Sequence, residues 1–246
     1  MNTYFEIIGT GTPVVFIHPP YMGHVVFHYQ RELANQAQCI FYDMRGNGKT
    51  PSGDQPITIS LLAEDLKHLL DKIDVSSAVI VGYSFGSLVA QEFALNNPSR
   101  VKGLVFVGGF SEVSTPLLNR EFQMGITTLR LGGYPLLARV LAQSHKVVKA
   151  DFVRQYKYSR MSDPNIALQM YEIGRKYNCT AQLHKIQAPV WAINGSHSKM
   201  FTYYMKLYRE HLPNIQEIVI ETAPHRIPTN YHKEFNHIMR KVLENF

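Results

Sequence analysis

A serine between two glycines is the first pattern in this sequence that could do chemistry. The run GYSFG at residues 82–86 directly follows an apolar run, AVIVGY, and directly precedes a segment with helical periodicity. Glycines two residues before and two after the serine remove side chains that would collide in a sharp turn between strand and helix. Such a turn raises a hydroxyl above the sheet edge, so Ser84 is predicted to be a nucleophile.

The residue after this serine could stabilise negative charge. Residues 85–95 are predicted to be a helix, and the N-terminus of that helix would point at Ser84. The backbone N–H of Phe85 is therefore predicted to donate to an oxyanion that forms during acyl transfer.

The order of predicted strands, the GYSFG run, an inserted helical segment and a late histidine together resemble the α/β-hydrolase superfamily. The resemblance covers essentially the whole chain. Residues 43–50, DMRGNGKT, resemble that family's D-x-R-G-x-G-x-S segment, with Thr50 in place of the serine, and we interpret Asp43 and Arg45 as structural. The serine at the turn argues against the related dehalogenases and epoxide hydrolases, which use an aspartate nucleophile there.

The resemblance implies that His225 is the general base. It lies in the run ETAPHR just after the last predicted strand, where the family carries its catalytic histidine. A neutral imidazole can take the proton of Ser84 during attack and return it to the leaving group, a role that suits a pKa near about 6.5.

The third member of the catalytic triad departs from the family pattern. A G-x-x-D segment is expected after the penultimate strand, but residues 195–198 read GSHS, which places Ser198 at the acid position. A hydroxyl can orient the base but cannot stabilise an imidazolium, as a carboxylate does. Other relatives take the acid from the end of the strand before the cap, near Gly108, and Glu112 is the nearest candidate. A Ser-His dyad and a triad completed by Glu112 both remain open.

The second donor to the oxyanion also departs from the family pattern. The family commonly has H-G-x after an early strand, whereas this chain has HPPYMG at residues 18–23. Proline has no N–H, so with Pro20 at the donor position the second hydrogen bond must come from Tyr21 or from a shifted backbone. Loss of one such donor costs about 3 kcal/mol of transition-state stabilisation.

Strands and helices alternate along most of the chain, which predicts an α/β fold. We expect the α/β-hydrolase fold, with a mostly parallel central sheet, flanking helices and a helical cap insertion. Helical apolar stripes with Thr58 or Ser60 as a start signal occur at 59–73, and similar stripes occur at 85–95 and 233–243. The predicted strands are Thr3–Ile8, Pro13–His18, Gln38–Asp43, Ala78–Tyr83, Lys102–Val107, Pro189–Asn194 and Gln216–Glu221.

The alternation stops after residue 110, which predicts two units. Residues 1–110 and 186–246 would form the core domain, and residues 111–185 a helical cap, with breaks at 132–135 and 162–164. An apolar inner cap face would suit a small acyl compound. The basic residues between Lys146 and Arg160 are interpreted as a solvated helix face, since nothing there resembles a nucleic-acid module.

Composition limits the remaining classes. The net charge is +6, but charged residues make up 18% of the chain and no run of like charge dominates. His24 and His28 share one helix face without a carboxylate partner, so no metal site is predicted, and no cofactor is required. The two cysteines show no disulfide or metal spacing, the first residues lack the basic and cleavage-site pattern of a leader, and no apolar run approaches the length of a membrane span. We therefore expect an unprocessed cytoplasmic protein with no nucleic-acid or membrane partner.

Hydrolysis of a small carboxylic ester, or of a related acyl or carbon–carbon bond, is the function that these patterns favour. The alternative is a ligand-binding or sensor protein on a degenerate hydrolase scaffold, motivated by Ser198 and Pro20 together. A cofactor-free oxygenase or perhydrolase on the same scaffold is a third, weaker hypothesis. The partner expected in each case is a small molecule.

Overall fold

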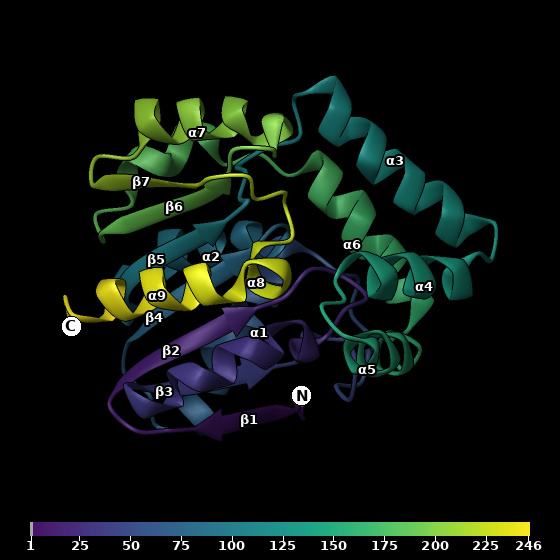
Figure 1. The fold of residues 1–246 in the computed structure, drawn as a ribbon, viewed down its shortest axis with the longest axis horizontal. Coiled ribbons are helices and arrows are strands. Elements are labelled where there is room, and N and C mark those ends of the chain that lie inside the picture. Colours follow the sequence, from purple (N-terminus) through teal and green to yellow (C-terminus); the bar gives the residue numbers. More distant parts are fainter. Residues whose placement is uncertain (1) are drawn as a thin grey trace.

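A single seven-stranded sheet organises the chain, whose residues 2–246 are described by a computed structural model (Figure 1). The strand order is β1-β3-β2-β4-β5-β6-β7, and every neighbouring pair is parallel except β1 with β3. The α/β-hydrolase fold class expected from the sequence is thereby confirmed. The strands are β1 (Phe5–Ile8), β2 (Thr12–Ile17), β3 (Ala37–Tyr42), β4 (Ala78–Tyr83), β5 (Val101–Val107), β6 (Val190–Gly195) and β7 (Ile215–Ile220).

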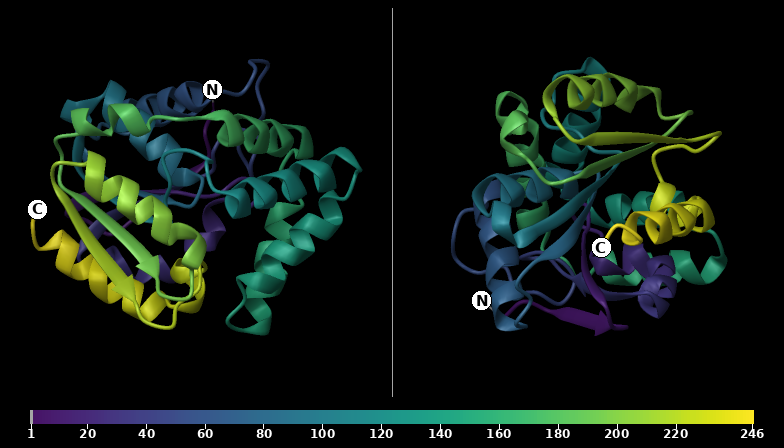
Figure 2. Two further views of the ribbon diagram at one scale, coloured as in Figure 1. Left: turned by 90° about the horizontal axis from the view of Figure 1, so that it is seen from above. Right: turned by 90° about the vertical axis from the view of Figure 1, so that its left-hand side faces the viewer.

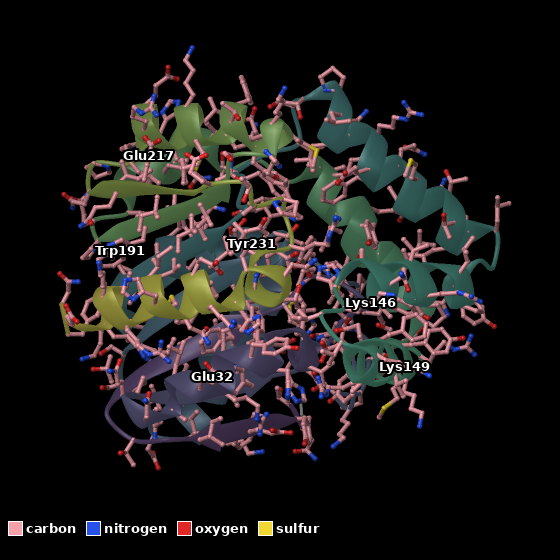
Figure 3. All side chains as sticks on the ribbon, in the orientation of Figure 1. Glu32, Lys146, Lys149, Trp191, Glu217 and Tyr231 are labelled. Carbon is pink, nitrogen blue, oxygen red and sulfur yellow. The ribbon has the colours of Figure 1, made fainter. Side chains whose placement is uncertain are left out.

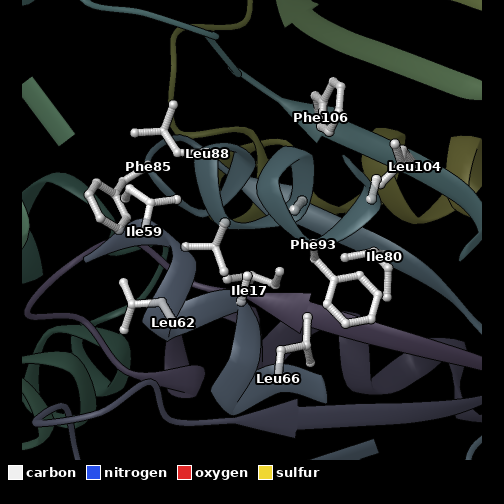
Figure 4. Close-up of a cluster of buried hydrophobic side chains, with 14 of the residues drawn as sticks. Ile17, Ile59, Leu62, Leu66, Ile80, Phe85, Leu88, Phe93, Leu104 and Phe106 are labelled. Carbon is white, nitrogen blue, oxygen red and sulfur yellow. The ribbon is translucent and has the colours of Figure 1, made fainter. Parts of the chain in front are cut away.

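Apolar side chains cover both faces of this sheet, which is why its central strands read as continuous apolar runs. Along β2, Val15 and Ile17 join one core and Val14 and Phe16 join the other, as the period of two requires. Helices α1 (Ile59–Lys72), α2 (Gly86–Asn96) and α7 (Lys199–His211) pack in the first core, part of which is shown in Figure 4. The 3₁₀ segment η1 (His24–Asn35) and α9 (His232–Leu243) pack in the second.

The predicted sheet-covering helices form where their apolar stripes lie. Thr58 caps α1, its hydroxyl accepting from the backbone N–H of Leu61 at 3.0 Å, which confirms one of the two predicted start signals. Short turns at η2 (Pro98–Arg100) and α8 (Ile227–Asn230) complete the connections of the core. None of the helices in residues 2–246 is long and apolar enough to cross a membrane.

Four helices follow β5 and lie beside the carboxyl ends of the strands (Figures 1 and 2). They are α3 (Pro116–Arg130), α4 (Tyr134–Ser144), α5 (Lys149–Ser159) and α6 (Pro164–Lys176), and the turn η3 (Thr180–Lys185) leads back to β6. The predicted breaks at 132–135 and 162–164 separate α3 from α4 and α5 from α6. A further break, at residues 145–148, was not predicted.

A loop after β3 ties these helices to the sheet. The buried Asp43 carboxylate accepts hydrogen bonds from the His24 and Lys49 backbone N–H groups and from the Tyr158 hydroxyl of α5. The Arg45 guanidinium makes a bidentate pair with Asp65 of α1, both bonds at 2.8 Å. The interpretation of Asp43 and Arg45 as structural residues agrees with these contacts.

Candidate active site

The GYSFG run forms the turn between β4 and α2. Ser84 has φ 53°, a left-handed conformation that is rare for a residue with a β-carbon. A β-carbon on Gly82 would overlap the backbone of Ser87, and one on Gly86 would overlap the carbonyl of Ile17 in β2. The two glycines are therefore required by close backbone packing on either side of the serine.

Backbone and side-chain hydrogen bonds hold this turn in place. The Ser84 N–H donates to the carbonyl of Val107 at the end of β5, at 2.9 Å. The Ser87 hydroxyl donates to the Ser84 carbonyl at 2.7 Å. Because α2 begins at Gly86, the Phe85 N–H lies at the positive end of an 11-residue helix.

Ser84 and His225 line the same cavity, which has a volume of about 160 Å³. Both side chains are only partly exposed, and their exposed portions face this space. No hydrogen bond joins the two side chains within residues 2–246. The cavity wall is mostly apolar, and its apolar members are Pro19, Pro20, Met22, Phe85, Leu118, Phe122, Leu141 and Tyr171.

His225 is held by aromatic packing. Its ring stacks on Phe201 of α7, with centroids 4.3 Å apart and planes 4° from parallel, and the Tyr83 ring lies 5.3 Å away on another side. The His225 Nδ1 atom is buried and has no hydrogen-bond partner. Burial, together with the neighbouring His145 and Arg226, lowers the pKa of His225 to about 3, so the ring is neutral.

Glu112, the candidate triad acid, makes its side-chain hydrogen bonds to residues other than His225. The Glu112 carboxylate accepts from the Thr180 hydroxyl and from the Asn178 side-chain amide at 2.6 and 2.9 Å. Residues 112 and 178 also form an antiparallel bridge. Glu112 thus fastens the start of the helical insertion to its end.

Ser198 and Gly108 do not supply an acid either. Ser198 immediately precedes α7, where its backbone N–H donates to the Gly195 carbonyl, and no hydrogen bond between its hydroxyl and His225 is formed within residues 2–246. Gly108 has φ 53°, and a β-carbon there would overlap the His225 ring at Nδ1. An acidic side chain at position 108 would therefore displace the His225 imidazole and could not orient it.

Tyr21 is also placed differently from its predicted role. Its backbone N–H donates to the Asn47 side-chain oxygen at 2.7 Å, so this N–H is already used in a buried hydrogen bond. To complete the oxyanion site, as predicted, this N–H would have to exchange the Asn47 oxygen for the substrate oxygen. Of the oxyanion donors predicted from the sequence, the Phe85 N–H alone stays available, because Pro19 and Pro20 line the cavity without an N–H.

The cavity contains two titratable residues that the sequence did not single out. His145, in the break between α4 and α5, donates from Nδ1 to the Leu141 carbonyl and accepts from the Tyr83 hydroxyl at Nε2, 3.0 Å away. Burial lowers the pKa of His145 to about 4. Glu121 lies at the rim, where desolvation raises its pKa. Glu121 shares a helix face with Leu118 and Phe122, which is the one sequence signal that could have found it.

No metal site is formed by the histidine pair that the sequence raised. His24 is buried and bonds to Asp43, whereas His28 lies in a different, shallow pocket beside Tyr29. Within residues 2–246, no group of three or more His, Cys, Asp or Glu side chains could hold a metal ion. Both cysteines are buried and free.

The sequence of this chain is similar to those of known proteins. The family model for the alpha/beta hydrolase fold matches residues 12–146. The putative carbamate hydrolase RutD of Azorhizobium caulinodans is 34% identical over 124 residues, which are 50% of this chain and 46% of that protein. The chain thus spans about half the length of this relative. The putative non-heme bromoperoxidase BpoC of Mycobacterium tuberculosis is 25% identical over 246 residues, covering 92% and 91% of the two chains.

Solved structures share the same fold. The esterase EaEST from Exiguobacterium antarcticum superposes with a TM-score of 0.89, covering 98% of this chain and 95% of the other at 18% identity. At that identity the likeness establishes the arrangement of strands and helices. It leaves the reaction to be argued from the residues around Ser84.

Proposed function

Since the chain belongs to the α/β-hydrolase fold family, we propose that it hydrolyses small carboxylic esters, with Ser84 as nucleophile and His225 as general base. The observation that carries this proposal is that a serine held at φ 53° and a neutral histidine line one small, mostly apolar cavity. Relatives and structural neighbours named as hydrolases or esterases support the same reaction class.

The reaction begins with attack of the Ser84 oxygen on the ester carbonyl. His225 takes the hydroxyl proton through Nε2, the ring nitrogen opposite the buried Nδ1, and returns it to the leaving alcohol. The Phe85 N–H and the positive end of α2 stabilise the oxyanion. Water then repeats the sequence on the acyl-enzyme, with His225 again as the base.

The missing carboxylate weakens this machinery in a defined way. Acceptance of a proton at Nε2 requires the tautomer that carries hydrogen on Nδ1, and this buried N–H has no acceptor. An unpaired buried donor costs about 1–3 kcal/mol. We therefore propose a Ser-His dyad, with Phe201 as a positioning residue that fixes the ring plane by stacking.

The helices α3 to α6 are proposed to act as the cap, in keeping with the predicted division into residues 1–110 with 186–246 and residues 111–185. Leu118, Glu121 and Phe122 of α3 and Leu141 of α4 supply one wall of the cavity, and the Ser84 turn supplies the other. A cavity of about 160 Å³ suits a short acyl chain.

Ester hydrolysis tests the proposal directly. Purified wild type should release p-nitrophenol from p-nitrophenyl acetate and butyrate faster than from the decanoate, because the cavity is small. Ser84→Ala should abolish this turnover, whereas Ser198→Ala should retain it. A folded wild type that hydrolyses none of these esters, or a Ser84→Ala variant with undiminished turnover, would overturn the proposal.

A ligand-binding protein is the second candidate, and three observations favour it. The His225 Nδ1 is unpaired, the Tyr21 N–H is already used, and Pro20 offers no donor. A binding site needs neither a partner that orients His225 nor a pair of oxyanion donors. Saturable binding of a short-chain ester or acid, measured by calorimetry, without turnover in wild type would support this candidate.

A further inference from the structure

Exposed apolar side chains are concentrated on one part of the molecule. Of the fourteen large apolar side chains that are exposed among the described residues, ten lie between Leu117 and Met161. Leu131 is 81% exposed and Leu136 is 60% exposed. Scattered single exposures are ordinary, but a concentration of this kind marks a surface that contacts something other than water.

Helix α4 and the link that follows it, residues 145–148, both carry exposed apolar side chains. Residues 136, 139, 140 and 143 are exposed at the spacing of one helix face, and they line a shallow groove. The link then exposes Val147 and Val148, 45% and 53% accessible, between Lys146 and Lys149. The opposite face of α4 is not free, because Leu141 belongs to the wall of the catalytic cavity.

The helical segment that carries this surface is net basic. Residues 111–185 contain 11 Lys and Arg against 5 Asp and Glu, a net charge of +6 that equals the net charge of the whole chain. Asp151 is the single acidic residue between positions 122 and 162. It is buried, and its carboxylate accepts from the backbone N–H groups of Val147 and Val148, from Arg154 and from Tyr29.

Three cations of the surface are left without a counter-charge. Within residues 2–246, no ion pair involves Arg139, Lys146 or Lys149, and Figure 3 marks Lys146 between α4 and α5 and Lys149 at α5. Exposed leucine and valine thus occur together with uncompensated basic side chains between residues 136 and 149.

We propose that this surface docks on a lipid bilayer that carries anionic headgroups. We call it the lipid face and define it by its members: Leu136, Arg139, Val140, Lys146, Val147, Val148 and Lys149. Apolar side chains that enter the headgroup boundary, flanked by cations that meet anionic lipids, are the pattern of interfacial helices. The uncompensated basic side chains favour an anionic partner, and the exposed leucine and valines favour one that also accepts apolar side chains, as a bilayer with anionic headgroups does.

This inference departs from the sequence-based expectation of no membrane partner. That expectation rested on the lack of a membrane-spanning run, whereas the lipid face would lie on a bilayer without crossing it. The inference also stands independently of catalysis, since none of the seven residues lines the catalytic cavity.

Flotation with lipid vesicles tests it. The full chain is mixed with vesicles of phosphatidylcholine alone, or of phosphatidylcholine with an equal amount of phosphatidylglycerol, and the fraction that floats is measured. We expect binding to the anionic vesicles, weak or no binding to the neutral ones, and a fall in binding with added salt.

Two double variants separate the contributions of charge and apolar surface. Lys146→Glu with Lys149→Glu should weaken binding to anionic vesicles by about tenfold or more, because each basic residue near such a surface contributes. Leu136→Ser with Val140→Ser should weaken it by a similar factor. The matched controls are Lys233→Glu with Lys241→Glu on α9, and Val219→Ser on β7, which are exposed elsewhere and should bind as wild type does.

Each variant should fold, because every substituted residue is exposed. Circular dichroism checks this expectation. Failure of the wild type to float with anionic vesicles would overturn the proposal, as would equal losses in the α9 control. Sedimentation velocity on the protein without lipid provides a second readout. Self-association that the Leu136→Ser and Val140→Ser pair abolishes would assign the surface to a second copy of the chain instead.

Discussion

Two histidines beside the central sheet, the buried His24 and the partly exposed His225, are held in opposite ways. His24, beside β3, has its Nδ1 2.9 Å from the Asp43 carboxylate, its Nε2 3.3 Å from Glu6, and the Tyr158 hydroxyl 3.2 Å away. Among the described residues, no carboxylate pairs with His225 beside β5, and the ring is stacked on Phe201 and close to Tyr83. The molecule therefore places its carboxylate–histidine pair in the loop that ties α5 to the core, and leaves the histidine at the cavity without one.

This difference separates a structural role from a chemical one. A histidine whose nitrogens are all bonded rigidifies its surroundings but has no free nitrogen with which to take up a substrate proton. A neutral histidine with one nitrogen facing a cavity can accept a proton, and it depends on packing for its orientation. The predictions below test this division.

Removal of each histidine in turn should give the largest contrast. His225→Ala should lower kcat for a short p-nitrophenyl ester by about 10⁴-fold, because the general base is lost. His24→Ala should leave kcat of the folded protein within about twofold and should instead reduce the free energy of unfolding, because a buried hydrogen-bonded group is removed. Steady-state kinetics and urea unfolding measure the two effects. A large kcat loss in His24→Ala would remove the distinction.

Loss of the structural carboxylate should be the next largest effect. Asp43→Ala leaves His24, the Lys49 N–H and the Tyr158 hydroxyl without their acceptor, and we expect a loss of about 3–5 kcal/mol in the free energy of unfolding. Glu217→Ala, which breaks an exposed pair with Arg209, is the control and should change stability far less. Equal losses in the two variants would contradict the role given to Asp43.

Replacement of the stacking ring should have a smaller and more selective effect. Phe201→Leu removes the flat contact with His225 and should lower kcat by up to about tenfold while KM changes little. Phe93→Leu is the control, since Phe93 is an equally buried aromatic residue in the same core cluster, whereas the ring that stacks on His225 is that of Phe201. Similar kcat values for the two variants would show that Phe201 has only a packing role.

The pH profile should show the smallest effect. We expect kcat/KM not to decline near pH 6.5, where a histidine base ordinarily becomes protonated. Because burial lowers the pKa of His225 to about 3, the base stays neutral well below pH 6.5, and kcat/KM should be nearly flat from pH 7 to about pH 5. A carboxylate partner would raise this pKa and move the decline toward neutral pH. A decline centred between pH 6 and 7 would therefore indicate an acid that contacts His225.

Low histidine pKa values also determine how the free energy of unfolding changes with pH. His225, His145 and His18 are neutral in the folded protein, with pKa values of about 3, 4 and 4, whereas an unfolded histidine titrates near 6.5. Unfolding therefore takes up protons between pH 6.5 and about 4, so the free energy of unfolding should fall as the pH falls through that range. The folded fraction should be measured at each pH beside the kinetics.

The strands and the nucleophile turn could be predicted from the sequence because each is set locally. Predicted bounds fall within one or two residues of β1 to β7, since central parallel strands are continuous apolar runs that end at turns. The GYSFG turn can be predicted because Gly82 and Gly86 are required by close contacts with nearby backbone, that of Ser87 in the same turn and that of Ile17 in the neighbouring strand.

The surroundings of His225 could not be predicted, because they depend on contacts between distant segments. Phe201 lies on α7, a helix that the sequence analysis missed: its start at Ser198 has no side-chain cap, and its first turns are rich in aromatic residues. Glu112 and Ser198 were proposed as acids by their distance along the chain. Their hydrogen bonds, and the available space beside Gly108, are set by the packed structure.

Covalent labelling by a fluorophosphonate tests the central claim, that Ser84 is activated by a histidine without a carboxylate. Wild type, Ser84→Ala, His225→Ala and Glu112→Gln would be treated in parallel, and labelling rates read by intact mass. The account predicts one label on wild type and on Glu112→Gln at similar rates, none on Ser84→Ala and a much slower rate for His225→Ala. An unlabelled folded wild type, or a Glu112→Gln variant as slow as His225→Ala, would contradict it.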